Sequence, residues 1–332
     1  MAVIMSGTSY QGTHAANYWL PALFEADTLD PKVGVVSVWD GIKDKVNISN
    51  MQFSGGLQPD QATPATPYGT ITVAEKVLLP LRAMLWMTYD PTVLENQWES
   101  ADLSKLLLDR NLPADFTSYV LYSVMQNIFG QDMEVGWWMS STSYAGTIVD
   151  QTDARYKYQF CDGFMKLIVN DPTVLNYASP AVITTSNILQ IMDGLIDLIT
   201  TNKKALVKRY KRMTFLFSPL TANIWRKFLV AATYKGIQFN EAADNSYAKY
   251  RIVVLNGIPD NTILFAECTK DKTGAFHIGM NSTDDDNNLM IEKTRWMDKT
   301  YGILGRMKFN TQIKFGNEIA CMTTLTQASF LP

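Results

Sequence analysis

The chain has 332 residues, of which 47% are hydrophobic and 18% are charged, and its formal net charge is −3. This length can bury a substantial core and predicts about two domains, while a charged fraction below the usual ~25% favours burial against partners. No run of about 18 apolar residues occurs, and no basic segment followed by an apolar run stands at the start, so we expect neither a membrane span nor a secretory signal.

The residues that commonly build active sites are scarce. The only histidines are His14 and His277, although acid–base and metal sites rely heavily on histidine. Cys161, Cys268 and Cys321 lie far apart without paired spacing, which indicates small buried side chains in a reducing compartment. No phosphate-binding glycine loop or nucleophile elbow is present. We therefore expect no catalytic, cofactor-binding or metal site.

Charge is unevenly placed along the chain. Between Lys203 and Arg251 there are eleven Lys and Arg residues against two acids, which gives +9, and the rest of the chain carries −12. Unlike patches on neighbouring copies of a self-assembling subunit would guide docking, although an isolated globule can also have a polarised surface.

The first thirty residues do not resemble the start of a compact domain. Residues 14–29 are compatible with one short helix whose apolar stripe contains Trp19, Leu20 and Leu23, and Pro31 follows it. No nearby element could bury that stripe, so we interpret the segment as an arm whose three apolar residues contact something outside it.

Residues 33–80 predict a long β excursion. In Lys45–Met51 one side carries Val46, Ile48 and Asn50 and the other Lys45, Asn47 and Ser49, and Thr70–Val73 alternates again, as strands with two unlike faces do. Gly and Pro residues between them predict an irregular tip. Two strands alone are marginal in water, so the hairpin needs a platform, which in an assembly is the next subunit. The tip residues expected to meet that neighbour are Ser54, Gly55, Gly56, Pro59, Pro64 and Pro67.

Residues 113–139 predict one long amphipathic helix. Pro113 suits its first turn, and apolar residues recur every four positions from Phe116 to Ile128. The pattern resumes at Val135 and Trp138 after Gly130, where a kink is expected.

From Thr184 onward the pattern is mixed. We expect Ser186 to cap a helix that carries Ile188, Ile191, Leu195 and Leu198. A short apolar strand at 213–217 is followed by a helix beginning at Ser218–Pro219. The wholly apolar stretch 252–255 predicts a central strand, and 262–268 predicts another. The last thirty residues return to alternation, with Met307, Phe309, Ile313 and Phe315 separated by polar residues.

The order and spacing of these parts resemble the Hong Kong 97-like major capsid proteins of tailed bacteriophages. In that family the spine helix commonly runs into a Glu and an apolar-aromatic stretch, as at Glu134 and residues 135–138 here. The resemblance implies an α+β fold with an N-terminal arm, an E-loop hairpin, a peripheral domain containing the spine helix, an axial domain and a return to the peripheral domain. The corresponding segments would be the arm at 1–32, the E-loop at 33–80, the peripheral domain at 81–183 with the spine helix at 113–139, the axial domain at 184–299 and the return to the peripheral domain at 300–332.

The resemblance implies a shell subunit and not an enzyme. It would form hexamers and pentamers that build the icosahedral or prolate head around double-stranded DNA, with localisation in the virion capsid after assembly in the host bacterial cytoplasm. Implied partners are further copies of the chain, portal, scaffolding and decoration proteins, and packaged DNA through non-specific contact, with no membrane. The alternatives are an encapsulin-like compartment around cargo enzymes, which has the same fold, and a hydrolase with an unrecognised site.

The run 203–212 contains six cations and no acid, namely Lys203, Lys204, Lys208, Arg209, Lys211 and Arg212. It is compatible with a solvated end of a helix, with a contact to an acidic surface of a neighbour, or with a contact to DNA phosphates. We expect no buried role for most of these side chains.

Overall fold

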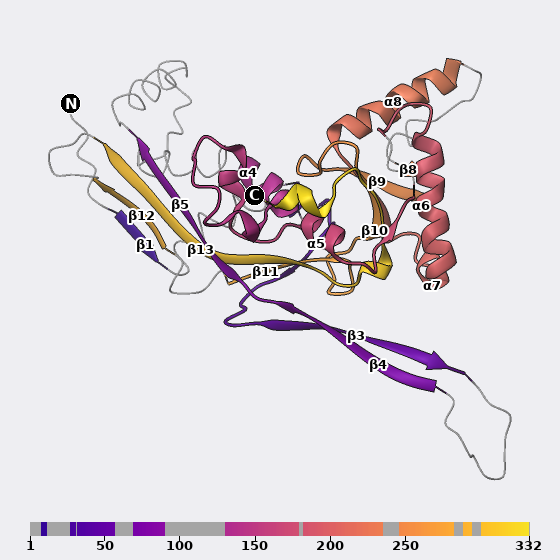
Figure 1. Cartoon of the computed structure of the whole chain (residues 1–332), viewed down its shortest axis with the longest axis horizontal. Helices are drawn as coiled ribbons and strands as arrows, with labels where there is room; N and C mark the ends of the chain where they lie inside the picture. Colours follow the sequence, from indigo (N-terminus) through magenta and orange to yellow (C-terminus); the bar gives the residue numbers. More distant parts are fainter. Residues whose placement is uncertain are drawn as a thin grey trace, which may run out of the picture.

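The computed structural model describes residues 8–11, 27–30, 32–56, 69–89, 130–178, 182–234, 246–281, 288–293 and 300–331. Two six-stranded sheets and a projecting hairpin make up its β structure (Figure 1). The first sheet has the order β1 (Thr8–Gln11), β12 (Asn288–Lys293), β13 (Tyr301–Ile313), β11 (Phe276–Met280) and β2 (Ser37–Trp39), with β5 (Leu81–Tyr89) paired to β13.

The second sheet has buried central strands. Its order is β6 (Leu175–Asn176), β14 (Ile319–Met322), β10 (Ile263–Glu267), β7 (Met213–Phe217), β9 (Tyr250–Val254) and β8 (Ser246–Tyr247). Every residue of β14, β10 and β7 is buried, because both faces of these strands are covered. Helices α6 (Ile188–Asn202) and α8 (Pro219–Tyr234) pack their apolar residues against one face, and α7 (Lys204–Val207) follows α6.

The other face of the second sheet belongs to a core shared with the first sheet. Helices α4 (Gly130–Met139) and α5 (Phe164–Asn170) contribute to it. The ring of Trp138 lies 5.2 Å from that of Phe164 and 5.5 Å from that of Phe276, measured between centroids. Trp137 contacts Phe309 of β13 edge to face at 4.9 Å. This aromatic cluster joins α4 to both α5 and the first sheet. Short 3-10 helices occupy Thr142–Tyr144, Ala154–Tyr158, Gly316–Glu318 and Gln327–Phe330.

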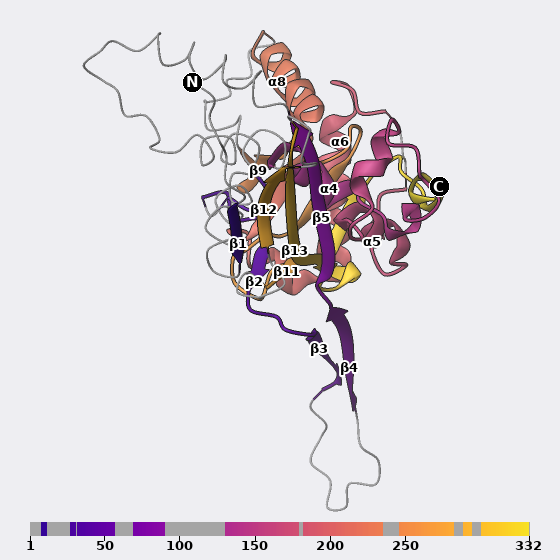
Figure 2. The same ribbon diagram turned by 90° about the vertical axis from the view of Figure 1, so that its left-hand side faces the viewer.

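A two-stranded hairpin, β3 (Val46–Gly55) and β4 (Gly69–Leu78), projects from the body (Figures 1 and 2). Its strands pair without a bulge from Val46–Leu78 to Gly55–Gly69. At its base Leu78 and Ile48 are buried with Ile42.

Several local predictions are confirmed. The strand at 213–217 and the helix that follows it begin where the sequence indicated, and Met307, Phe309 and Ile313 of β13 are buried as alternation predicted. All three cysteines are buried.

Two local predictions are wrong. The residue before α6 is Asn187, not Ser186, and the Asn187 amide oxygen accepts a hydrogen bond from the Thr184 backbone at 2.8 Å. The Ser186 hydroxyl instead lies 2.9 Å from the Thr184 hydroxyl, so a local turn takes the place of a side-chain cap. The strand near 252–255 is not central, because β9 lies next to the two-residue edge strand β8 and exposes Val254.

Other predictions fall outside the described residues. Only 130–139 of the expected helix over 113–139 is described, and it is helical. The arm residues Trp19, Leu20 and Leu23 lie outside, whereas residues 27–29 form a turn. Among the described helices, none is long and apolar enough to cross a bilayer.

Candidate assembly surfaces

The hairpin exposes an apolar face. Ile71, Val73 and Val77 lie on one side of β4 and are 67%, 50% and 46% exposed. Leu79 continues this row, and the exposed Glu75 interrupts it between Val73 and Val77. An exposed row of β-branched residues on a projecting hairpin is typical of an interaction surface. Of the predicted tip residues, Ser54 and Gly56 are described and exposed, and Gly55 is the last residue of β3. Pro59, Pro64 and Pro67 lie outside the described residues.

The base of the hairpin is fastened to the body by polar contacts. Lys76 Nζ lies 2.6 Å from Asp171 Oδ2. Burial alone would raise the pKa of Asp171, but hydrogen bonds from Lys76 and Thr173 hold it below its ordinary value. The side-chain amides of Asn310 and Gln312 donate to the backbone carbonyls of Leu79 and Val77 at 2.8 and 2.9 Å. The hairpin therefore leaves the body in a defined direction.

The structure divides the basic run 203–212 into two groups. Lys204, Lys208 and Lys211 are exposed, and Lys203 is half-buried where α6 ends. Arg209 and Arg212 instead reach the carboxylate of Glu267, the last residue of β10.

These two arginines neutralise a buried acid. Glu267 is only 1% exposed, Arg209 Nη1 lies 3.3 Å from its Oε2, and Arg212 Nη1 lies 3.6 Å from its Oε1. A carboxylate removed from water is costly unless a cation compensates it. Arg209 and Arg212 are therefore exceptions within a run for which mostly no buried role was expected, although their own side chains are 55% and 46% exposed. An acid at the end of an otherwise apolar strand, 263–267, was the signal available in the sequence.

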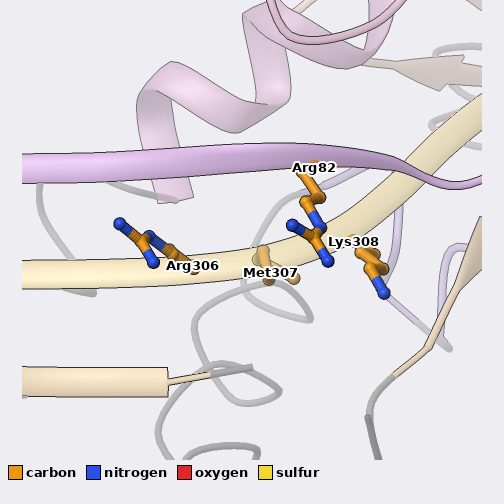
Figure 3. A pocket seen from close by; sticks show the side chains of 4 residues that line it. All are labelled: Arg82, Arg306, Met307 and Lys308. Carbon is orange, nitrogen blue, oxygen red and sulfur yellow. The ribbon is translucent and has the colours of Figure 1, made fainter. Parts of the chain in front are cut away.

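A further surface, which the sequence did not indicate, lies on the outer face of β5 and β13. Met84 and Trp86 are 64% and 55% exposed there, and the ring of Trp86 lies over Gly302. Beside them a hollow of about 50 Å³ is lined by Arg82, Arg306, Met307 and Lys308 (Figure 3). The register pairs Arg82 with Lys308 and Met84 with Arg306, so the cations and the apolar pair occupy adjoining parts of one face.

The segment 27–30, here named the arm root, is held by a buried polar network. Glu134 of α4 accepts hydrogen bonds from the Thr28 backbone N–H at 2.9 Å and from the Thr28 hydroxyl at 2.6 Å. Trp138 Nε1 donates to the same hydroxyl oxygen at 2.8 Å. Burial raises the pKa of Glu134, although its bonds to Thr28 act in the opposite direction.

Another buried ionisable group is His277 of β11. Its Nδ1 accepts a hydrogen bond from Trp39 Nε1 at 2.9 Å, which requires the ring to be neutral at that nitrogen. Burial and the nearby Lys314 lower its pKa to about 4. Among the described residues, no group of three or more His, Cys, Asp or Glu side chains could hold a metal ion.

No family model and no curated protein matches the chain. Solved structures do match over nearly its whole length. The satellite phage P4 procapsid, which includes the size determination (Sid) protein, has 11% identity and a TM-score of 0.57 and covers 92% of this chain and 98% of that one. The capsid of Myoviridae phage XM1 has 12% identity and a TM-score of 0.54, with 98% and 95% covered. The capsid of a native GTA particle has 10% identity and a TM-score of 0.51, with 97% and 91% covered.

These likenesses show that the chain has the fold of phage capsid structures. The α+β, Hong Kong 97-like fold class expected from the sequence is thereby confirmed.

Proposed function

We propose that this chain is a structural subunit that assembles with copies of itself into the head shell of a tailed bacteriophage. The shell would consist of hexamers and pentamers and would enclose double-stranded DNA. The chain's role is to make contacts and not to catalyse a reaction, and its place is the virion capsid after assembly in the host cytoplasm.

The observation that carries this proposal is the projecting hairpin with its exposed apolar row. Monomeric proteins seldom expose large contiguous apolar patches, because covering them with another surface contributes about 25 cal/mol per Å². The base of the hairpin is fixed by Lys76 and Leu78, so its exposed face is presented ready for a neighbouring copy. The capsid fold supports this function by analogy.

In domain terms, we assign residues 33–80 to the E-loop and 184–299 to the axial domain. The hairpin β3–β4 supports the E-loop assignment. The sheet covered by α6 and α8 supports the axial assignment only through β7 to β10, because β6 and β14 also join that sheet, whereas β11 and β12 join the first sheet. The peripheral domain would then comprise 81–183 and 300–332, with 1–32 as the arm.

Further partners follow from the same proposal. Portal, scaffolding and decoration proteins would bind the assembled or assembling shell. Lys204, Lys208 and Lys211 are the exposed cations of the basic run and remain candidates for an acidic neighbour or for DNA phosphates. Arg209 and Arg212 are weaker candidates, because Glu267 already engages both.

The proposal is tested by placing a charge on the apolar face of the hairpin. Val73→Lys should leave the monomer folded, since the side chain is half exposed, but should block shell formation by burying a charge against the neighbour. Thr72→Lys is the matched control, because the adjacent side chain points to the opposite face of the same strand.

Assembly is followed by light scattering as the protein is concentrated, and circular dichroism checks the fold. Shells formed equally well by Val73→Lys and wild type would argue that this face of the hairpin does not dock, and a wild type that stays monomeric would overturn the function itself.

A further inference from the structure

A buried carboxylate lies where the arm root meets the body, and neutral donors satisfy it. Glu134 is 4% exposed and Thr28 is 1% exposed. Both oxygens of Glu134 accept hydrogen bonds from Thr28, as described above. Within the described part of the chain, no Lys or Arg forms an ion pair with Glu134, so its charge is stabilised by hydrogen-bond donors alone.

The same carboxylate joins three segments that are distant in sequence. The Gly257 backbone N–H, in the turn after β9, points at Glu134 Oε1 over 3.4 Å. The neighbouring Asn256 side chain donates to Asp27 Oδ2 at 2.9 Å. The arm root is therefore bonded to helix α4 and to the turn 256–257 at once.

Gly257 permits this close approach. A Cβ atom at this position would lie 2.1 Å from the Glu134 carbonyl oxygen and 2.4 Å from Trp138 Cδ1. The turn is thus pressed against α4 beside the carboxylate, and the joint has one tight arrangement.

We propose that Glu134 is a positioning residue for assembly, whose carboxylate fixes the arm root to α4 and to the turn 256–257. It thereby fixes the position of Asp27, the first described residue of the arm root. The assembly consequence rests on the proposed function, whereas the hold on the arm root is a property of the single subunit.

This role should affect local opening of the arm root and the global free energy of unfolding differently, which ordinary packing would not do. Because burial raises the pKa of Glu134, the ionised carboxylate lowers global stability at neutral pH, and protonation would relieve that cost. Yet the ionised form makes the stronger hydrogen bonds to Thr28, since charge-assisted bonds exceed neutral ones. A Gln at this position offers one acceptor oxygen in place of two, so it should loosen the arm root by more than it lowers the free energy of unfolding, because relief of the buried charge offsets part of the lost bond.

Trypsin provides a local readout of this loosening. Lys32 is the first Lys or Arg in the chain, the next is Lys43, and Lys32 is exposed. The turn at 30–34 is closed by hydrogen bonds from Val33 and Gly34 to the Asp30 carbonyl, so cleavage after Lys32 requires local opening.

The experiment compares Glu134→Gln with wild type in the full chain at pH 7.5. We expect cleavage after Lys32 to be about tenfold faster in Glu134→Gln, a larger effect than the change in its unfolding midpoint accounts for. Glu75→Gln, which removes an exposed carboxylate of the hairpin, is the control and should match wild type in both measurements. Thr28→Val is the second variant and should accelerate the same cleavage, because it removes the hydroxyl between Glu134 and Trp138.

The pH dependence of the hold on the arm root provides an additional test. Among the described residues, the charged groups near Glu134 are Asp27, which faces it, and Asp30, which raises the pKa of Asp27. As pH falls through the folded-state pKa of Glu134, hydrogen-exchange protection of the segment containing Thr28 should decrease in wild type and stay level in Glu134→Gln.

The outcomes are separable. Unchanged cleavage in both Glu134→Gln and Thr28→Val, or faster cleavage that merely follows a lower unfolding midpoint, would overturn the role of Glu134. Faster cleavage together with normal shells in electron micrographs would overturn its part in assembly. A wild type that forms no shells would instead contradict the proposed function, and the cleavage ratio would still decide whether Glu134 holds the arm root.

Discussion

The buried acid Glu267 allows a quantitative prediction about the basic run. Replacing both Arg209 and Arg212 with Gln leaves that carboxylate in a nearly dry site without a cation. Breaking a fully buried pair in this way costs about 3–5 kcal/mol, whereas exposed pairs contribute about 0.2–1 kcal/mol. The two arginine side chains are 55% and 46% exposed, so solvent screens each contact and the cost lies between these limits.

We expect the double variant to lose about 2–3 kcal/mol of unfolding free energy and each single variant about 1 kcal/mol. Urea unfolding of the monomer, followed by circular dichroism, measures both. The matched control replaces Lys208 and Lys211 with Gln, two exposed cations in the same run, and should change stability by less than about 0.5 kcal/mol.

A third substitution identifies the cause. Adding Glu267→Gln to the double arginine variant removes the uncompensated charge and should recover most of the loss. If the arginine and lysine double variants unfold at the same urea concentration, the two arginines do not stabilise Glu267 and the reasoning is refuted.

Three further predictions use other parts of the structure. Deleting residues 54–67 should leave the body folded, because shortening a hairpin tip costs little in loop closure, but should prevent assembly; normal shells from this variant would show that the tip does not dock. Gly257→Ala should lower the free energy of unfolding by about 3 kcal/mol or more, since its Cβ would overlap the Glu134 carbonyl. Gly274→Ala should cost less, because its Cβ would meet its nearest atom at 3.1 Å. Equal unfolding midpoints for the two variants would contradict the close approach at Gly257. The pKa of His277 is about 4 in the folded state, so the unfolded state takes up a proton on this residue at higher pH than the folded state does. The free energy of unfolding should therefore fall as pH decreases from about 6.5 towards 4, and His277→Gln should flatten this dependence. An unchanged slope in the variant would exclude His277 as its source.

Patterns within single segments predicted most of the elements. A mostly apolar run at 213–217, alternation at 307–313 and turn residues around 256–260 each belong to one stretch of chain, and the structure contains the corresponding strands and turn. The order of these elements was sufficient to indicate the fold class, because the sheet strands and the helix that follows β7 occur in the expected sequence.

Side-chain roles that depend on distant partners could not be predicted in the same way. Arg209 and Arg212 looked like part of a solvated run, because Glu267 is more than fifty positions away in the sequence. Glu134 was noted only as the residue before an aromatic stretch, and its partner Thr28 is 106 positions away. The cationic and apolar face of β5 and β13 likewise arises only when two distant strands pair in one register.

The central claim is that this chain builds a closed shell from copies of itself. The most direct test is electron microscopy of the full-length wild-type protein after purification and concentration. We expect closed particles of uniform size, built from rings of five and six subunits. Particles that never form at any concentration, with the protein remaining a folded monomer or a small oligomer, would contradict this claim.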